Sequence, residues 1–247
     1  MHFAPPPRFT SLALLPLIIP QGLYVRFHAA QLDEAAGPRS GETGTGPLLR
    51  VLILGDSSAA SVGVATQDEG LSGQFVSALA KKYSVHWHLQ ARCGATTASV
   101  MRLLDEVPPG TYDVALTALG VNDVKNGWPL GTYLNRTRLL YTRLQDEFGV
   151  RFICASGMPP IQDFPLLPDP LRWALKQRAA LFDRCHRQLI GDFDGVRHLR
   201  GPERLDPAHM ASDGFHPGPE IYREWGQLAA QQVMQNWSDD LRDRTHD

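Results

Sequence analysis

The sequence predicts an α/β fold, in which a parallel β-sheet carries helices on both faces. From residue 50 onward, short apolar segments with the length of buried strands alternate with longer segments of helical periodicity. Parallel strands need crossover connections, which helices usually supply, so this alternation favours a parallel sheet. The 247 residues suffice for one domain whose core needs no disulfide or metal.

Charge and cysteine content narrow the classes of function. The formal net charge is −2 and no block of like charge is present, which argues against a nucleic-acid-binding surface. The cysteines, Cys93, Cys154 and Cys185, are an odd number without the spacing of a metal site. We therefore expect reduced, mostly buried thiols, which fit a cytoplasmic protein.

Residues 1–49 are interpreted as an N-terminal arm and linker. An apolar run at residues 12–19 has the length of the hydrophobic part of a signal peptide. Pro16 and Pro20 interrupt this run, which is too short to span a bilayer alone. Two alternatives stay open. The arm rests its apolar side on the domain or on a membrane surface, or residues 1–30 act as an export signal or membrane anchor.

The segment at residues 33–47 is rich in Gly, Pro, Glu and Thr and is predicted to be a linker. One domain is expected at residues 50–237, followed by a charged tail at residues 238–247. Within the domain we expect strands at 51–54, 85–90, 112–119, 150–155 and 195–199, and helices at 70–83, 97–106, 130–148, 171–189 and 217–237.

The individual elements have distinct signals. The first strand is a run of four apolar residues, as in strands buried on both faces, and the last helix begins at a proline. The second strand alternates and places His86 and His88 on one face. Two histidines without a third ligand nearby favour an exposed polar face, so no metal site is predicted.

A proline-rich segment at residues 157–170 interrupts the alternation. Its five prolines exclude helices and sheet ladders, so we expect a semi-rigid apolar loop. Met158, Phe164 and Leu166 are interleaved with the prolines. We predict that these three side chains form a wall of the substrate-binding site.

Four loops carry residues of chemical interest. In an open parallel sheet, the loops at the carboxyl ends of the strands gather along one edge. The loops contain, in chain order, Gly55-Asp56-Ser57, Cys93-Gly94-Ala95-Thr96-Thr97, Gly120-Val121-Asn122-Asp123 and Asp213-Gly214-Phe215-His216.

Together these loops hold the groups that acyl transfer needs. Ser57 is a weak nucleophile until a base removes its proton, and His216 is the candidate base. Asp213 would fix the tautomer of that histidine. The backbone N–H groups of Ser57 and Gly94 and the side-chain amide of Asn122 would stabilise the oxyanion, and Ser57 is expected beside the start of a helix.

A second Asp-x-x-His pair, Asp206 and His209, is an alternative source of the base. We prefer the pair Asp213 and His216 because it adjoins the proline that starts the last helix and lies closer to the C-terminus.

The four blocks, in this order and spacing, resemble those of the SGNH (GDSL-type) hydrolases, whose name comes from Ser, Gly, Asn and His. In this chain the matching residues are Ser57, Gly94, Asn122 and His216, the last preceded by Asp213. The resemblance covers residues 50–237 and implies a flavodoxin-like three-layer α/β/α sandwich. It also implies ester hydrolysis through an acyl-enzyme, with neither metal nor cofactor. The chain departs from the GDSL pattern at Ser58, where the name has Leu.

The resemblance leaves the substrate open, because the family acts on lipid, aryl, sugar-acetyl and thioester substrates. We expect an esterase for small-molecule esters with short acyl chains, since no large apolar lid is visible. The alternatives are a carbohydrate acetylesterase, for which Trp128 and Trp173 are candidate stacking residues, and a lysophospholipase or thioesterase. A non-catalytic binding module is disfavoured because the catalytic set is complete. No oligomeric state is predicted.

Overall fold

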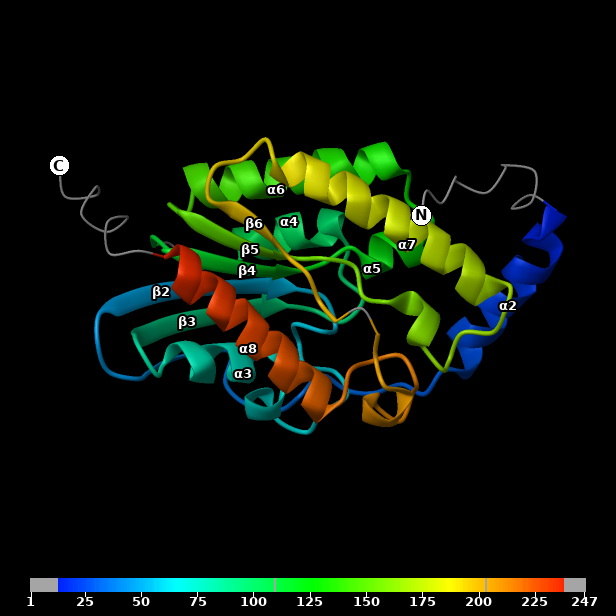
Figure 1. Ribbon diagram of the computed structural model, residues 1–247, viewed down its shortest axis with the longest axis horizontal. Helices are drawn as coiled ribbons and strands as arrows, with labels where there is room; N and C mark the ends of the chain where they lie inside the picture. The colour runs from blue at the N-terminus through cyan, green and yellow to red at the C-terminus, as the bar shows by residue number, and fades with distance from the viewer. Residues whose placement is uncertain (1–12, 109, 203, 238–247) are drawn as a thin grey trace.

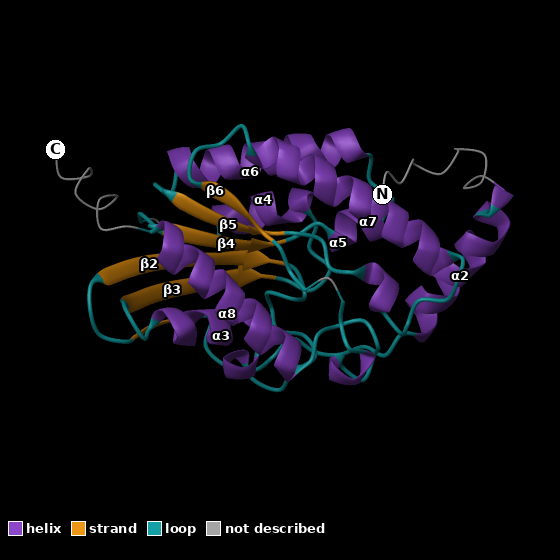
Figure 2. Cartoon of the chain, viewed as in Figure 1, coloured by secondary structure: helices purple, strands orange, loops and turns teal. Residues whose placement is uncertain are grey.

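The computed structural model describes residues 13–108, 110–202 and 204–237, and the predicted charged tail at 238–247 lies outside them. A central sheet lies between two helical layers, so the predicted three-layer α/β/α fold is confirmed (Figures 1 and 2). The strands are β1 (Ser40–Thr43), β2 (Leu48–Gly55), β3 (Ser84–Ala91), β4 (Val114–Ala118), β5 (Phe152–Ser156) and β6 (Val196–Leu199). The α-helices are α2 (Leu15–His28), α3 (Leu71–Leu79), α4 (Thr97–Asp105), α5 (Val121–Lys125), α6 (Leu130–Asp146), α7 (Leu171–Ile190) and α8 (Pro219–Asn236).

The strand order in the sheet is β1-β3-β2-β4-β5-β6. From β2 the chain crosses to β3 on one side, and β4 then returns to the other side of β2. Such a reversal opens a crevice at the carboxyl ends of the two central strands, where ligands of open α/β sheets bind. The crevice between β2 and β4 is therefore the place where the fold favours a site.

The sheet differs from the prediction at one edge. All pairings are parallel except that of β1 with β3, which is antiparallel. The strand β1 lies within the segment predicted to be a linker. Its sequence, Ser-Gly-Glu-Thr, is exposed along its whole length and has no apolar alternation. Main-chain pairing with β3 holds this strand, together with a contact of 3.3 Å between Glu42 and Nδ1 of His86. Neither depends on apolar side chains, which explains why the side-chain pattern gave no signal.

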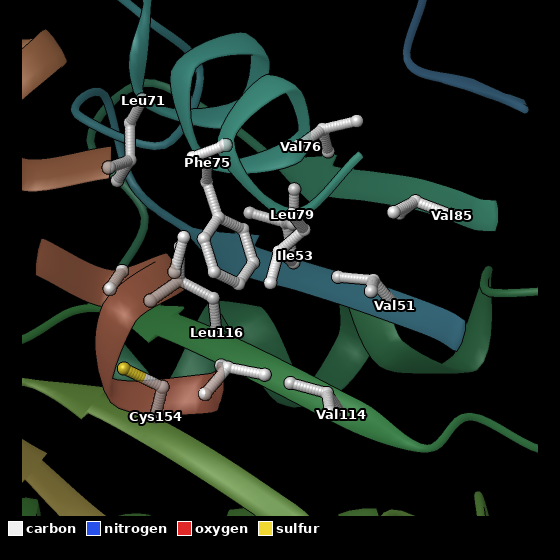
Figure 3. Packing of buried hydrophobic residues seen from close by; sticks show 14 of the residues in the cluster. Val51, Ile53, Leu71, Phe75, Val76, Leu79, Val85, Val114, Leu116 and Cys154 are labelled. Atoms are coloured by element: carbon white, nitrogen blue, oxygen red, sulfur yellow. The ribbon is translucent and has the colours of Figure 1, made fainter. Parts of the chain in front are cut away.

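Alternate residues of the central strands pack on opposite layers. Val51 and Ile53 of β2 face α3 and α8, whereas Leu52 and Leu54 face α4, α6 and α7. Figure 3 shows Phe75 of α3 lying over the first of these faces. All five side chains are fully buried. Burial of each such side chain contributes about 1.5–3 kcal/mol to stability.

The proline-rich segment is a packed loop. It contains a short 3₁₀ turn, η2 (Ile161–Asp163), and it buries Ile161, Phe164 and Leu167 against α7. Two further 3₁₀ turns, η1 (Gln67–Glu69) and η3 (Pro207–His209), lie before α3 and α8.

The helix α2 was not expected from the sequence, and it continues through Pro20, one of the two prolines that interrupt the apolar run. Pro16 lies in the first turn of α2, where a missing N–H costs little, and only Pro20 removes a hydrogen bond from the interior. The residues before 13 lie outside the described part of the chain. Among the described helices, none combines the length and the apolar content needed to cross a membrane.

The three cysteines are free, but the expectation that they are mostly buried is wrong. Cys154 is buried in the core, Cys185 is half-buried, and Cys93 is exposed. Cys93 follows the β3 strand at the carboxyl edge of the sheet, where the chain leaves the core.

Candidate active site

The turn after β2 holds Ser57 at the carboxyl end of a central strand. Gly55, the last residue of β2, lies so close to its neighbours that an added Cβ would approach the Cβ of Ala59 to 2.3 Å. The N–H of Val62 donates to the carbonyl of Ser57 at 2.9 Å, which closes the turn.

No α-helix follows Ser57, which corrects the expectation of a helix start. Ser61 adopts φ +62° and Gly63 φ +106°, and these left-handed residues end the turn before a helix can propagate. The next helix, α3, begins at residue 71. Any anion stabilisation beside Ser57 therefore comes from individual N–H groups of the turn.

Ser57, His216 and Asp213 form a continuous chain of hydrogen bonds. The Nε2 atom of His216 lies 3.0 Å from Oγ of Ser57, and its Nδ1 atom lies 2.5 Å from Oδ2 of Asp213. Because the carboxylate accepts the Nδ1 proton, Nε2 is left free to accept the hydroxyl proton of Ser57. Ser57 and Asp213 are each 7 % exposed. The arrangement can deprotonate a hydroxyl group that faces a cavity.

The loop before α8 fixes the Asp213 carboxylate. Its Oδ1 atom accepts the backbone N–H groups of Phe215 and His216 at 2.9 and 3.0 Å. Burial raises the pKa of Asp213, but the hydrogen bonds from the His216 ring and from these two N–H groups outweigh burial, so the pKa is lowered. The carboxylate therefore stays ionised opposite the His216 ring.

The second Asp-x-x-His pair lies elsewhere. Asp206 caps η3 by accepting the N–H of Ala208 at 2.9 Å, and His209 is exposed and absent from the cavity lining. The His209 carbonyl accepts the N–H of Gly218, so this residue supports the loop through its backbone.

Asn122 lies opposite Ser57, in the first turn of α5. Its Nδ2 donates to the carbonyl of Ala95 at 3.0 Å and, over a longer 3.3 Å, to Oδ2 of Asp56. The buried Asp123 accepts the backbone N–H and the hydroxyl of Thr97 at 3.0 and 2.7 Å. These bonds tie the loop after β4 to the loop after β3.

Gly94 lies on an exposed turn and does not line the cavity. Its φ of +76° is in the left-handed region, so the backbone conformation explains the glycine. A Cβ at this position would meet open space, so crowding does not explain it.

Two residues that support the Gly94 turn come from the segment predicted to be a linker. Glu34 accepts the N–H of Cys93 through Oε1 at 2.5 Å and pairs with Arg39 through Oε2 at 2.5 Å. Arg39 also donates to the carbonyl of Ala91 at 2.7 Å. The sequence carries no local signal for the contacts with Cys93 and Ala91, because each joins residues more than 50 positions apart.

Asp56, next to Ser57, is a buried carboxyl. Burial raises its pKa to about 6, and the Ser58 N–H and the nearby His216 and Lys125 lower it only in part. Its Oδ1 atom accepts the N–H of Ser58 at 3.0 Å. The sequence singled out this residue only as part of the Gly-Asp-Ser turn.

Ser57 and His216 open onto a cavity of about 850 Å³, a volume that includes open solvent at its mouth. Met158 and Phe164 line it, whereas Leu166 does not and instead donates its backbone N–H to Gly214. The remaining apolar lining includes Leu205, Met210, Phe215, Ile221 and Trp225.

The tryptophan of the cavity was missed from the sequence. Trp225 lies on α8 and donates to Oγ of Ser156 at 3.2 Å. Trp128 and Trp173, the candidates for sugar stacking, do not line the cavity, and the guanidinium of Arg136 lies over the Trp128 ring. A pair of stacking tryptophans beside Ser57 is therefore not formed by these two residues.

Comparison with solved structures shows the same fold in the esterase EstA, in TesA and in an acetylxylan esterase. The psychrotrophic esterase EstA of a Pseudoalteromonas species is 18 % identical, with a TM-score of 0.53 over 76 % of this chain and 97 % of that one. TesA is 16 % identical, with a TM-score of 0.58 over 75 % and 98 %. An acetylxylan esterase from Geobacillus stearothermophilus is 16 % identical, with a TM-score of 0.53 over 76 % and 93 %.

A search of curated proteins finds no match. The model of the GDSL-like lipase/acylhydrolase family matches residues 53–224, a span that makes up well over half of the chain and contains Ser57, Asp213 and His216. The chain therefore belongs to the GDSL-like lipase/acylhydrolase family and is a carboxylic ester hydrolase.

Proposed function

We propose that the protein hydrolyses carboxylic esters through an acyl-enzyme on Ser57, with His216 as general base and Asp213 as its orienting carboxylate. The observation that carries this proposal is the chain of two hydrogen bonds from the Ser57 hydroxyl to the buried Asp213. A base aligned in this way removes the hydroxyl proton and so converts a neutral serine into a competent nucleophile.

In the first half-reaction, Nε2 of His216 takes the Ser57 proton while Oγ attacks the ester carbonyl. The tetrahedral intermediate collapses, and His216 returns the proton to the departing alcohol. In the second half-reaction, His216 deprotonates a water molecule, which attacks the acyl-enzyme. His216 then returns this proton to Oγ of Ser57 as the ester bond to the enzyme breaks and the carboxylic acid is released. Asp213, whose lowered pKa keeps it ionised, stabilises the imidazolium at each stage.

The proposed oxyanion donors are the backbone N–H groups of Ser57 and Gly94 and the Asn122 amide. Within the described residues, neither backbone N–H has a protein acceptor, so both are available to a ligand. The Asn122 amide already donates twice, and its longer bond, to Asp56, is the one that an oxyanion would replace. Donors of this kind are each worth about 10²- to 10³-fold in rate.

The cavity supports a preference for short acyl chains, from acetyl to butyryl. Phe164 packs edge to face on Phe215 at a centroid distance of 5.1 Å, and both rings line the cavity. Phe164, Leu205 and Ile221 are buried, so the inner wall is closed by packed side chains. Extending the space for a longer chain would require these side chains to move.

The test is hydrolysis of p-nitrophenyl acetate, butyrate and octanoate by the wild type and by three variants. Ser57→Ala and His216→Ala should lower kcat at least about 10³-fold, because each removes a member of the proton-transfer chain. His209→Ala is the matched control and should retain wild-type activity, since its side chain is exposed.

The proposal fails if His209→Ala is the inactive variant, or if Ser57→Ala keeps the wild-type rate. Among the three esters we expect acetate and butyrate to give the highest kcat/KM. A maximum at octanoate would overturn the assignment of short acyl chains while leaving the catalytic residues intact.

A further inference from the structure

The helix α2 is fixed on the domain by one of its sides. The Gln21 side chain donates to the carbonyl of Asp169 at 2.7 Å and accepts the N–H of Leu171 at 3.0 Å. Ile18 and Val25 pack into the apolar cluster of α7 and the proline-rich loop. These contacts hold the helix in one orientation, so its opposite side faces solvent.

That opposite side is unusually apolar. Six of the ten large apolar side chains that are exposed in the described chain lie on this one helix: Leu15, Leu17, Ile19, Leu23, Tyr24 and Phe27. Phe27 is 75 % exposed and Tyr24 is 62 % exposed. We refer to these six residues as the α2 face. Single apolar residues scattered over a surface are ordinary, whereas a contiguous apolar surface of this kind marks an interaction site.

The pattern within α2 also separates it from an ordinary surface helix. A helix that packs on a soluble domain has one apolar stripe and a polar outer face. In α2 the apolar residues lie on all sides, including the side that the domain leaves uncovered. The helix is therefore suited to contact the domain with one side and a second apolar partner with the opposite side.

The charge of this region favours an anionic lipid surface as the second environment. Residues 1–32 contain no Asp or Glu, whereas Arg8 and Arg26 are basic. Arg26 lies in the last turn of α2, beside Phe27. Basic residues next to exposed apolar ones are attracted to membranes that contain anionic phospholipids.

We infer that the α2 face docks the protein onto the surface of a membrane that contains anionic phospholipids. With 14 residues, α2 is about 21 Å long, shorter than the roughly 30 Å hydrocarbon core, so it would lie along the interface. In Figure 1, α2 lies at the end of the molecule toward which the strands point. Ser57 lies in the turn that directly follows β2, so it belongs to the same end of the sheet. The inference goes beyond ester hydrolysis, and either one can hold without the other.

The experiment is flotation of the full chain with lipid vesicles. Wild type should float with vesicles of phosphatidylcholine and phosphatidylglycerol, and less with phosphatidylcholine alone. The double variant Leu23→Gln/Phe27→Gln should lower the vesicle-bound fraction at least about tenfold, because two apolar side chains no longer enter the interface. The matched control is Leu139→Gln on α6, since Leu139 is 52 % exposed and Leu23 is 51 % exposed. This control should bind like wild type.

An unchanged midpoint of urea unfolding shows that the double variant is folded, independently of hydrolysis. Equal binding of wild type and double variant would overturn the inference. So would a wild type that stays in solution as a dimer that the double variant cannot form, because a second copy of the chain would then cover the α2 face.

Discussion

The turns that follow β2 and β3 lie next to each other, because the two strands are parallel neighbours in the sheet. The two turns are nevertheless held in place in different ways. The turn with Ser57 is buried and is closed by its own backbone bonds. The turn with Gly94 is exposed and is anchored by Glu34 and Arg39, which precede the sheet. The comparison teaches that the proposed nucleophile lies in a turn closed mainly by residues close to it in the sequence, whereas a proposed oxyanion donor depends on residues far from it in the sequence.

The Ser57 turn has one further local support, the buried Gln67. Its amide donates to the carbonyls of Ala35 and Ala60, both at 3.1 Å, and its carbonyl oxygen accepts the hydroxyls of Ser61 and Ser72 at 3.0 and 2.8 Å. Both the amide N–H groups and the carbonyl oxygen of the Gln67 side chain therefore have hydrogen-bond partners.

Among changes that test how these two turns are held, the largest effect on stability is expected from Asp56, whose buried carboxyl lies in the Ser57 turn. Its pKa is raised from 3.8 to about 6 by burial, so folding favours the protonated form. The corresponding stability is complete below about pH 4 and is lost as pH rises through about 6, a loss of about 2–3 kcal/mol. Asp56→Asn removes this loss and keeps an acceptor for the N–H of Ser58.

The measurement is the free energy of unfolding in urea between pH 4 and pH 8. The stability of Asp56→Asn relative to wild type should rise by about 2–3 kcal/mol across this range. If the free energies of unfolding of the two proteins changed in parallel with pH, burial of the Asp56 carboxyl would not destabilise the folded protein at neutral pH.

The next largest effect is expected from Gln67→Leu. This change removes one partner from each of two hydroxyls and two carbonyls, so the free energy of unfolding should fall by about 2 kcal/mol. Gln145→Leu is the matched control, because the half-buried Gln145 amide makes one hydrogen bond in the described residues, to the carbonyl of Asp194. It should change stability by less than about 0.5 kcal/mol. Equal losses in the two variants would contradict a special role for Gln67.

The smallest effect is expected from Glu34→Ala, which loosens the Gly94 turn without touching the cavity. We expect kcat to fall about tenfold with little change in KM, because a misplaced oxyanion donor affects the transition state more than the bound ester. Glu42→Ala is the control, since the exposed Glu42 contacts only His86 in the described residues. A Glu34→Ala enzyme with wild-type kcat would show that the Gly94 turn is positioned without this anchor.

The sequence predicted those parts of the molecule whose signal is local. The apolar run of β2, the helical periodicity of α6 and the four loop motifs each depend on neighbouring residues, and the structure places Ser57, Asn122, Asp213 and His216 around one crevice. These residues could be found because the carboxyl ends of parallel strands meet at one edge.

The remaining features depend on tertiary contacts that no local pattern encodes. The strand β1 forms through main-chain pairing with β3, and Glu34 reaches the Gly94 turn only after the chain has folded back. Likewise, Leu166 and Phe164 are near neighbours in an irregular loop, and only the packing of that loop decides which one faces the cavity. The domain start at residue 50 stays a prediction, although residues 34–43 contact the sheet.

The strand β1 also affects how the protein behaves among other copies of itself. An unpaired strand at the edge of a sheet offers its free N–H and carbonyl groups to any strand of another chain, and long edge strands are prone to aggregate. The eight-residue β3 would be such an edge, but β1 covers it and presents four exposed residues in its place. At the other edge, β6 is also only four residues long. The sheet thus ends in two short strands, and shortening the chain past residue 43 would uncover a long one.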